Sequence, residues 1–490
     1  MPGFHVENFG CRAARADGEA VSDRLRAAGH CEQQPSHADV VIVNTCSVTA
    51  EADRAARAFI RRVHRANPDA RIVVTGCYAQ RAPQELASLA GVSAVVGNSH
   101  KAFAPHIALG LMEPAPAHPL LDVPPQPGEL IQIQAAQAVR RGGPPPQAVV
   151  WADDLFAHSF LEEAQVVPGA QTRPNLKIQE GCGNRCTFCV IPQTRGSSRS
   201  LPAETVLNQV QGFVAAGGNE LVFSGINLGR WGRDLPGLQD GSPRTLFALV
   251  RRIFAETALP RLRLSSIEPM DWDAEMIGLM REFGGTRLAR HAHLPLQSGS
   301  DAVLRRMHRR YRPWHYEEKV WALVDAAGPA LTLGADVMLG FPGETDAEFN
   351  ETLALVRRLP FGYLHLFPFS PRPGTRAWPL HAADPVRATA VKERMAVLRS
   401  VAAEKATAHR ARFVGRELDA ITLHTPAERA ADGQTAALAE NFLPVEIHGR
   451  MSANQTVRVR ITGLNADGTL RAVEANQAEP AQYAAATMSV

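Results

Sequence analysis

The sequence predicts a mixed α/β protein with three folded parts: a small domain with a parallel sheet, a partial (β/α)6 barrel and a small C-terminal β-barrel. Short apolar strands alternate with helical segments over residues 1–110, and the same alternation returns after about residue 171. Short alternating strands with glycine turns replace it from about residue 413. A length of 490 residues suits about three domains of ordinary size.

The first part contains three apolar segments that predict strands, FHVENFG, VVIVNTC and RIVVTGC. Helices are expected near residues 17–28, 50–66 and after Gln80. Strands that alternate with helices are joined by crossovers, which makes the sheet parallel. Residues 111–170 differ in composition, because prolines gather in EPAPAHP, DVPPQPGE and RRGGPPPQ. This composition predicts a linker or an irregular insertion, and therefore a domain boundary.

Residues 171–412 contain six further strand segments, which are NLKIQEG, ELVFSGI, RLRLSSIE, HAHLPLQS, LTLGADVMLGF and YLHLFPFS. Helical segments such as AETVLNQVQGFVAAG lie between them, so the six β/α units predict an open, partial version of the (β/α) barrel. Residues 413–476 carry ELDAITLH, LPVEIHG and TVRVRITGL, which predict a small all-β barrel.

The charge of the chain is nearly balanced, with 52 basic and 49 acidic residues and a formal net charge of +3. A nucleic-acid site must therefore be a local patch rather than a property of the whole chain. No apolar run is long enough to span a bilayer, and the N-terminal segment lacks a basic stretch followed by an apolar one. A cytoplasmic location is the resulting expectation.

Two arginine-rich segments are candidates for such a patch. The first is a helical face at spacings of three and four, formed by Arg54, Arg57, Arg61 and Arg65. The second is the denser run RRMHRRYR, with Arg305, Arg306, Arg309 and Arg310, where guanidinium groups attract phosphate and Tyr311 could stack on a base. In the terminal barrel the candidates are Phe413, Phe442, Arg458 and Arg460. The alternative for each set is an ordinary solvated surface.

The seven cysteines carry the strongest chemical signal. Cys182, Cys186 and Cys189 are separated by three and by two intervening residues, just after the first barrel strand. Three thiolates on a cluster of four irons leave one iron without a protein ligand, so that iron can bind a small molecule. A structural zinc site is the alternative, but it would need a fourth ligand that does not follow nearby.

Three more cysteines, Cys11, Cys46 and Cys77, each stand at or just beyond the end of one predicted parallel strand. The carboxyl ends of parallel strands face one crevice, so these thiols are expected to meet in space and to hold a second cluster. The alternative is that they are buried core thiols. Cys31 falls outside this pattern and is expected to be an ordinary thiol.

The loop Cys182–Cys189, with Phe188 before the third cysteine, resembles the cluster loop of the radical S-adenosylmethionine (SAM) superfamily. The resemblance implies that the open iron binds SAM and that an electron from the cluster cleaves it to a 5′-deoxyadenosyl radical. The two cysteine triads and the order of the domains resemble the methylthiotransferases, which join a cluster domain, a radical SAM barrel and a C-terminal TRAM barrel. Two [4Fe–4S] clusters and the insertion of a methylthio group at an unreactive carbon are therefore expected.

Five segments resemble the enzymes that act at C2 of N6-threonylcarbamoyladenosine 37 of tRNA: NTCSVTAEAD, GCYAQ, KIQEGCGNRCTFCVIPQTRGSSRS, SGINLGRWGRDL and LRLSSIEP. Gln193 departs from the aromatic residue more usual at its position. The expected partners are the anticodon loop of tRNA, an electron donor such as a flavodoxin or ferredoxin, and a sulfur source. Residues expected near SAM or the substrate are Phe188, Gly225, Asn227, Ser266, Glu268, Gln297 and Asp336. For Phe188 and Gly225 the plain alternatives are a packed aromatic and a tight turn.

Other functions stay open at this point. Within the family, the substrate could be isopentenyladenosine in tRNA or an aspartate of a ribosomal protein. Outside it, a noncatalytic iron–sulfur protein that binds RNA or senses redox state is possible, although such a protein needs no SAM pocket. An ordinary SAM methyltransferase is disfavoured, because cysteines occupy the strand ends where a glycine-rich loop would stand.

Overall fold

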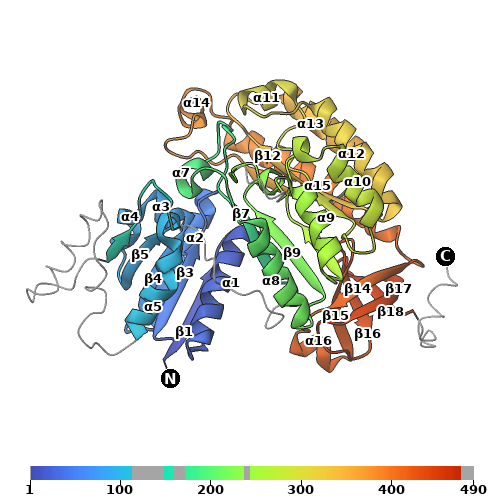
Figure 1. Cartoon of the computed structure of the whole chain (residues 1–490). Coiled ribbons are helices and arrows are strands. Elements are labelled where there is room, and N and C mark those ends of the chain that lie inside the picture. The colour runs from blue at the N-terminus through green and yellow to red at the C-terminus, as the bar shows by residue number, and fades with distance from the viewer. Residues whose placement is uncertain (1, 113–147, 159–171, 237–242, 476–490) are drawn as a thin grey trace, which may run out of the picture. The chain divides into compact units, whose positions relative to one another are not determined.

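The computed structural model describes residues 2–112, 148–158, 172–236 and 243–475. Its contacts divide the chain into two compact units. The N-terminal unit comprises Met1–Gln165, Glu180–Gly183 and Val190–Ser197, and the C-terminal unit comprises the remainder. The predicted α/β fold class is confirmed, since parallel sheets and a closed small barrel are both present (Figure 1).

The N-terminal unit is built on a six-stranded sheet in the order β2-β1-β3-β4-β5-β6, and its paired strands are all parallel. Its strands are β1 (Gly3–Asn8), β2 (Cys31–Glu32), β3 (Val40–Thr45), β4 (Arg71–Gly76), β5 (Val92–Gly97) and β6 (Val149–Trp151). The short β6 lies inside the stretch predicted to be an insertion, and it pairs with β5. That part of the insertion therefore completes the sheet, while most of it lies outside the described residues.

Helices cover both faces of this sheet. They are α1 (Arg12–Ala27), α2 (Ala50–Ala66), α3 (Cys77–Arg81), α4 (Pro83–Ala87) and α5 (Ala104–Met112). Alternate residues of β3 serve the two faces, because Val41 packs with Ile60 of α2 while Ile42 packs with Leu25 of α1. The helix expected near residues 17–28 begins earlier, at Arg12, whereas the helix expected after Gln80 is present as α4 and is preceded by the short α3.

The C-terminal unit opens with a half barrel of parallel strands, and all six predicted strands are present. They are β7 (Asn175–Glu180), β9 (Glu220–Gly225), β10 (Arg261–Leu264), β11 (His291–His293), β12 (Thr332–Leu339) and β13 (Phe361–Pro368). They form the sheets β10-β9-β7-β8, with β8 at Arg199–Ser200, and β11-β12-β13. The two sheets are joined where Ile267 N donates to His293 O at 3.1 Å.

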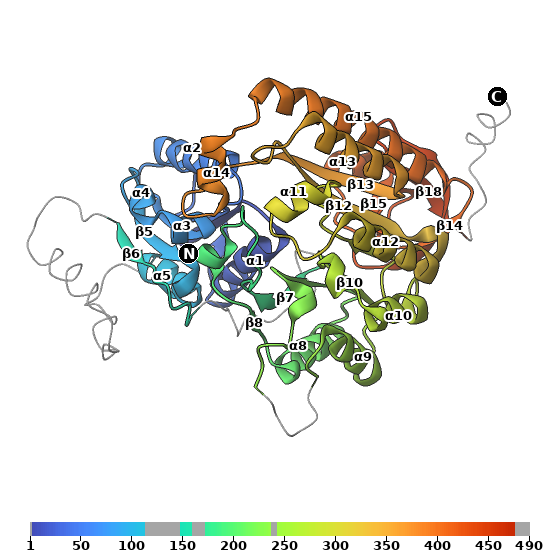
Figure 2. The same cartoon turned by 90° about the horizontal axis from the view of Figure 1, so that it is seen from above.

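Helices lie around the outer side of these strands (Figure 2). They are α8 (Ala203–Ala215), α9 (Leu246–Glu256), α10 (Ala274–Phe283), α11 (Asp301–Arg306), α12 (Pro313–Ala327), α13 (Asp346–Arg358) and α15 (Ala388–Ala411). Two shorter helices, α7 (Ile191–Arg195) and α14 (Ala377–Ala383), follow the cysteine loop and β13. A capping box between Thr345 and Glu348 fixes the start of α13.

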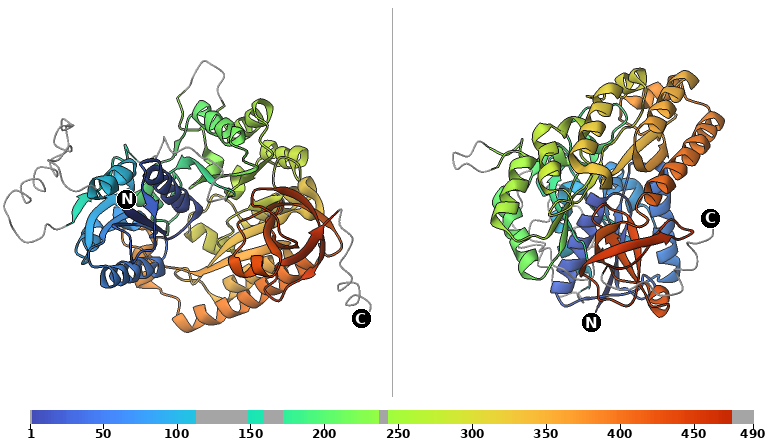
Figure 3. Two further views of the ribbon diagram at one scale, coloured as in Figure 1. Left: turned by 90° about the horizontal axis from the view of Figure 1, so that it is seen from below. Right: turned by 90° about the vertical axis from the view of Figure 1, so that its right-hand side faces the viewer.

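The chain continues into a closed barrel in the order β14-β15-β16-β18-β17 (Figure 3). Its strands are β14 (Glu417–Thr422), β15 (Gln434–Ala439), β16 (Pro444–His448), β17 (Thr456–Leu464) and β18 (Leu470–Glu474), with α16 (Ala427–Ala431) between the first two. Val445, Ile447 and Val459 alternate into its core. Both barrels belong to one compact unit, so the four predicted domain ranges remain a prediction. Over the described ranges, none of the helices is long and apolar enough to cross a membrane.

Candidate functional site

Three cysteines of the N-terminal unit stand at the carboxyl ends of neighbouring parallel strands. Cys46 follows β3, Cys77 begins α3 directly after β4, and Cys11 is the N-cap residue of α1 after β1. Gly10 has a φ of +114°, and a Cβ atom there would lie 2.6 Å from Cys46 Cβ and 2.9 Å from its Sγ. The loop that carries Cys11 therefore packs directly on Cys46, which only glycine at position 10 permits.

The electrostatics of these thiols suit a shared cation. Burial, together with the nearby Cys77 and Cys11, raises the pKa of Cys46 to about 12. Thiolates that repel one another are stabilised when they bind a positively charged iron centre, which is how metal binding lowers thiol pKa values. Cys46 and Cys77 are buried and Cys11 is exposed, whereas Cys31 lies apart in the exposed β2. The triad thus fits an iron–sulfur cluster held by three thiolates.

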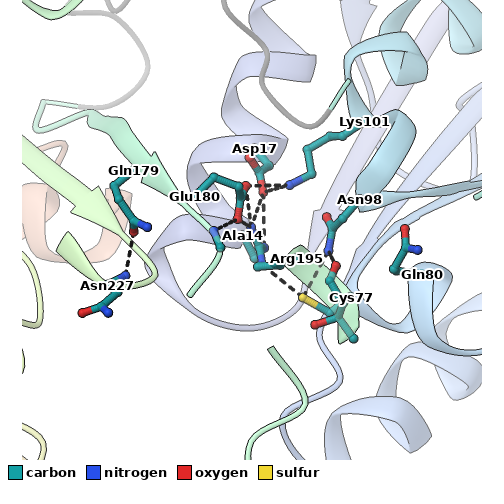
Figure 4. Close-up of polar contacts among 12 residues, drawn as sticks. Ala14, Asp17, Cys77, Gln80, Asn98, Lys101, Gln179, Glu180, Arg195 and Asn227 are labelled. Carbon is teal, nitrogen blue, oxygen red and sulfur yellow. Dashed lines mark hydrogen bonds and ion pairs between the residues drawn. The ribbon is translucent and has the colours of Figure 1, made fainter. Parts of the chain in front are cut away.

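A buried ionic network lies behind Cys77 (Figure 4). Arg195 Nε donates to Cys77 Sγ at 3.2 Å, and Arg195 Nη1 donates to both carboxylate oxygens of Glu180 at 2.8 and 3.0 Å. Asp17 accepts from Arg195 at 3.3 Å and from Lys101 Nζ at 2.5 Å. Lys101 Nζ also lies 3.4 Å from Glu180. Two cations and two carboxylates balance in a region with almost no exposure to solvent.

This network fixes the charge and position of Arg195. Burial disfavours the charged guanidinium, but Cys77, Glu180 and Asp17 together raise the pKa of Arg195 above its usual range. Asn98 adds a second contact, since its Nδ2 donates to Cys77 Sγ at 3.4 Å and to Thr194 O at 2.8 Å. Sequence reasoning missed these residues, because no local motif connects positions that only the fold brings together.

The second cysteine loop begins after β7. Gly181 has a φ of +69°, and a Cβ atom there would lie 1.9 Å from Ser197 O, so the turn requires glycine. Cys182 N donates to Gly196 O at 3.0 Å. These contacts hold the start of the loop within the N-terminal unit.

The rest of this loop, which carries Cys186 and Cys189, is held within the C-terminal unit. Cys189 N donates to Cys186 O at 3.2 Å, which forms a tight turn. Thr187 N donates to Met307 O at 3.0 Å, and Thr187 O accepts from Ala377 N at 2.8 Å. The turn is therefore held on two sides, by Met307 directly after α11 and by Ala377 at the start of α14.

Arg309 donates a hydrogen bond to a cysteine sulfur of this loop, as Arg195 does to Cys77. Its Nη1 donates to Cys186 Sγ at 3.3 Å, its Nη2 to Glu268 Oε2 at 2.6 Å, and its Nε to Tyr311 Oη at 3.2 Å. Burial opposes the charge, yet Tyr311, Glu268 and Cys186 raise the pKa of Arg309 above its usual range. Each cysteine triad therefore has one buried arginine in contact with one of its sulfur atoms.

Two expectations for this segment need correction. Arg309 is 7% exposed and is used inside the protein, so it is not available at the surface for an RNA phosphate. Tyr311 is fully buried, and its hydroxyl lies 2.7 Å from Pro295 O and 2.8 Å from Leu296 O. It cannot stack on a base. The run of arginines in the sequence does not indicate which of their side chains point inward.

Some residues expected near SAM lie around the first barrel strands. Phe188 is half-buried and its ring meets Phe341 edge-on, with centroids 6.5 Å apart. Gln179 Oε1 accepts from Asn227 N at 2.7 Å (Figure 4). A Cβ atom at Gly225 would lie 3.0 Å from Gln179, so a side chain there would make Gln179 shift by a few tenths of an ångström. Gln179 thus fixes the turn after β9.

The remaining residues of this set are more scattered. Ser266 and Glu268 follow β10 and are half-buried, and Glu268 is paired with Arg309. Gln297 follows β11 with a φ of +62°, and its N donates to Asp336 O at 2.7 Å. Asp336 lies within β12 rather than at its end, and its carboxylate faces two histidines.

The arginine sets divide by exposure. On α2, Arg54, Arg61 and Arg65 are exposed, whereas Arg57 contacts Tyr78 Oη and pairs with Glu85 at 2.9 Å. On α11, Arg305 is exposed beside Asp301, and Arg306 forms a bidentate pair with Glu348, both bonds being 2.8 Å. Arg310 is exposed.

The candidate RNA-binding residues of the terminal barrel already make contacts within the protein. Phe413 is buried in the barrel core, and Phe442 packs on His291 with ring centroids 4.4 Å apart. Arg458 is exposed and pairs with Glu417 and Asp419. Arg460 Nη2 donates to Ala475 O at 3.3 Å.

A parallel half barrel whose first strand leads into a loop with three cysteines defines a radical SAM enzyme, and residues 176–356 match the Radical SAM superfamily. Residues 3–97 match Uncharacterized protein family UPF0004. The chain belongs to the radical SAM methylthiotransferase family, because relatives of that kind match nearly its whole length at 30% identity or more. It is accordingly a transferase of sulfur-containing groups.

Two relatives illustrate the match. The threonylcarbamoyladenosine tRNA methylthiotransferase MtaB of Aquifex aeolicus (strain VF5) is 32% identical, over 93% of this chain and 99% of the relative. The tRNA-2-methylthio-N(6)-dimethylallyladenosine synthase of Sorangium cellulosum (strain So ce56) is also 32% identical, over 89% of this chain and 85% of the relative. A solved structure of the radical SAM methyltransferase TsrM from Kitasatospora setae has a TM-score of 0.48, 16% identity and 77% coverage of both chains.

Proposed function

We propose that this enzyme transfers a methylthio group to C2 of N6-threonylcarbamoyladenosine at position 37 of tRNA. The observation that carries the proposal is the presence of two separate cysteine triads, each with a buried arginine on one sulfur. A noncatalytic iron–sulfur protein has no need of a cysteine triad that follows the first strand of a half barrel. The name of the Aquifex aeolicus relative supports the choice of substrate.

The triads have separate roles in this proposal. Cys182, Cys186 and Cys189 would hold one [4Fe–4S] cluster, which when bound supplies the electron that cleaves SAM to a 5′-deoxyadenosyl radical. The second triad, Cys11, Cys46 and Cys77, would hold the other cluster and leave one iron open for sulfur. The chain's own part is to hold the sulfur ligands in place, and the buried networks around Arg195 and Arg309 contribute to this.

The tRNA contacts of the proposal rest on exposed arginines. Arg54, Arg61 and Arg65 share one face of α2, and Arg305 and Arg310 stand at the end of α11. Guanidinium groups of this kind bind phosphates and position an RNA without reading its sequence. The adenosine itself must be splayed out of its stack, which an anticodon loop allows.

Partners and location follow from the same proposal. The reaction needs an electron donor, such as a flavodoxin or ferredoxin, and a source of sulfur. It takes place where tRNA is matured, so the enzyme is placed in the cytoplasm.

The test is mass spectrometry of tRNA nucleosides from cells with and without the gene. Loss of the 2-methylthio form of threonylcarbamoyladenosine on deletion supports the proposal. Its persistence together with loss of the methylthio group from isopentenyladenosine would contradict it. This second candidate has support of its own, because a relative named for dimethylallyladenosine matches at the same 32% identity. Loss from a ribosomal aspartate would contradict both tRNA candidates.

A further inference from the structure

Two histidines and an aspartate converge on three neighbouring strands of the half barrel, and none of the three is adjacent in sequence to a cysteine. Asp336 on β12 and His365 on β13 are direct partners in the sheet register, and His293 on β11 pairs with the nearby Gly334. Strand residues alternate between faces, so Asp336 lies opposite Ala335 and Val337, which are fully buried. The three polar side chains therefore share the face that does not pack on the apolar layer.

The distances between their ligand atoms are those of a metal site. His293 Nε2 and His365 Nδ1 each lie 3.2 Å from Asp336 Oδ1, and one ligand atom from each residue can be chosen so that all lie within 4.8 Å of one another. Ligands at about 2.1 Å from one cation are separated by about 3.0–3.4 Å, depending on the coordination geometry. The two histidine-to-aspartate separations match this range, and the two histidine nitrogens lie within 4.8 Å of each other.

One nitrogen of this group lacks a hydrogen bond. His293 is 8% exposed, and its Nε2 makes no hydrogen bond within the described part of the chain, although Asp336 Oδ1 is only 3.2 Å away. A buried nitrogen without a partner is costly, and a cation between the three residues would satisfy it.

The surroundings also resemble those of a metal site. His293 Nδ1 contacts Tyr363 Oη at 3.1 Å, and the same oxygen contacts His291 Nε2 at 2.8 Å. Histidines that bind metals commonly use the second ring nitrogen for such a hydrogen bond, which fixes the tautomer and the ring orientation. His293 is held in this way, whereas His365 is 63% exposed in its side chain.

We propose that His293, Asp336 and His365 bind one divalent cation of the Mn²⁺, Fe²⁺ or Zn²⁺ type. Two imidazoles and one carboxylate are ligands that such cations accept, and neither set of cysteines is involved. Three protein ligands leave coordination positions for water or for an anionic oxygen of a bound substrate. The site is additional to both clusters.

The experiment uses the full chain with both clusters reconstituted and oxidised, so that Mn²⁺ gives the electron paramagnetic resonance signal. Mn²⁺ is titrated in, and the decrease of the free Mn²⁺ signal reports binding, with Zn²⁺ added afterwards as a competitor. We expect one Mn²⁺ per chain at a site that Zn²⁺ displaces. Asp336→Asn and His365→Ala should each weaken this binding at least about tenfold, as loss of a ligand does.

His365→Ala is the decisive variant, because the side chain is exposed and its removal leaves the core intact. Asp153→Asn is the matched control, since Asp153 faces His100 at 3.8 Å but is not part of a three-residue group. The control should bind Mn²⁺ like the parent protein. Equal binding by the parent and His365→Ala, or no Mn²⁺ binding by the parent, would overturn the proposal.

Discussion

Arg195 Nε lies 3.2 Å from Cys77 Sγ, so the segment that follows the SAM-type cysteine loop in sequence contacts a sulfur of the other triad. Arg195 is fully buried and is anchored by Glu180 and Asp17. Hydrogen bonds and charge at a ligand sulfur are among the features that set the reduction potential of an iron–sulfur cluster. This contact therefore gives Arg195 a positioning role that can be measured.

Replacing Arg195 should destabilise the fold. Arg195→Leu leaves Asp17 and Glu180 with Lys101 as their remaining cation in a dry environment, and breaking a buried ionic group of this kind costs about 3–5 kcal/mol. Urea unfolding of the cluster-free protein measures the loss. Arg251→Leu is the control, because its pair with Glu282 is exposed and is worth less than about 1 kcal/mol. Equal effects of the two substitutions would be evidence against the network.

Arg309 should act on the other triad. Arg309→Met removes the donor to Cys186 Sγ and the positive charge beside it, so we expect the reduction potential of that cluster to fall. Redox titration followed by electron paramagnetic resonance reports the change. Arg306→Met is the control, because the guanidinium of Arg306 is used on Glu348 and on Gly343 O. An unchanged potential in Arg309→Met would show that the contact has no electronic effect.

The two triads should account for all the cluster iron. The triple change of Cys11, Cys46 and Cys77 to alanine should lower the iron content of the anaerobically reconstituted chain from about eight to about four per molecule. The optical absorbance of the clusters should fall in proportion. Cys31→Ala should change neither quantity, since Cys31 is exposed and lies apart in β2. Unchanged iron in the triple variant would mean that the strand-end thiols hold no cluster.

Acid should weaken the fold through His409. Burial, assisted by Arg412 and Arg410, lowers the pKa of His409 to about 4, against 6.5 in the unfolded chain. The unfolded state therefore binds the proton first, and the stability present above about pH 6.5 declines as the pH falls toward 4, by about 3 kcal/mol in total. In His409→Gln, whose side chain does not titrate, the urea midpoint should decline less between pH 6.5 and 4.5. An identical decline would contradict this assignment.

Exposed arginines should contribute to tRNA affinity through phosphate contacts. Arg61→Glu and Arg310→Glu should each weaken tRNA binding and reduce the salt dependence of the affinity by about one ion per lost phosphate contact. Binding assays over a range of salt concentrations measure both effects. The control is Arg281→Glu, because Arg281 on α10 forms an exposed ion pair with Asp325 on α12. An unchanged salt slope in Arg61→Glu would exclude α2 from the interface.

The sequence by itself determined the elements and predicted the sulfur ligands. Strand period and β-branched content predicted all six strands of the half barrel, because burial between helices demands those residues. The placement of Cys46 and Cys77 at strand ends was readable, since parallel topology brings such ends to one edge of the sheet. Helix starts were less certain, because α1 begins at Arg12 directly after its cysteine and carries no side-chain cap to mark it.

Only the tertiary structure decided which charged groups serve the site. Arg309 and Arg310 are adjacent in sequence, yet one is buried on Cys186 and the other is exposed. Asp17, Lys101 and Arg195 come from three distant segments, and His293 and Asp336 meet only through the register of neighbouring strands. Local sequence fixes backbone preference over a few residues, but the pairing of buried charges depends on long-range packing. The predicted sulfur ligands follow a loop motif or the ends of predicted strands, whereas the ionic network around them follows no pattern in the sequence.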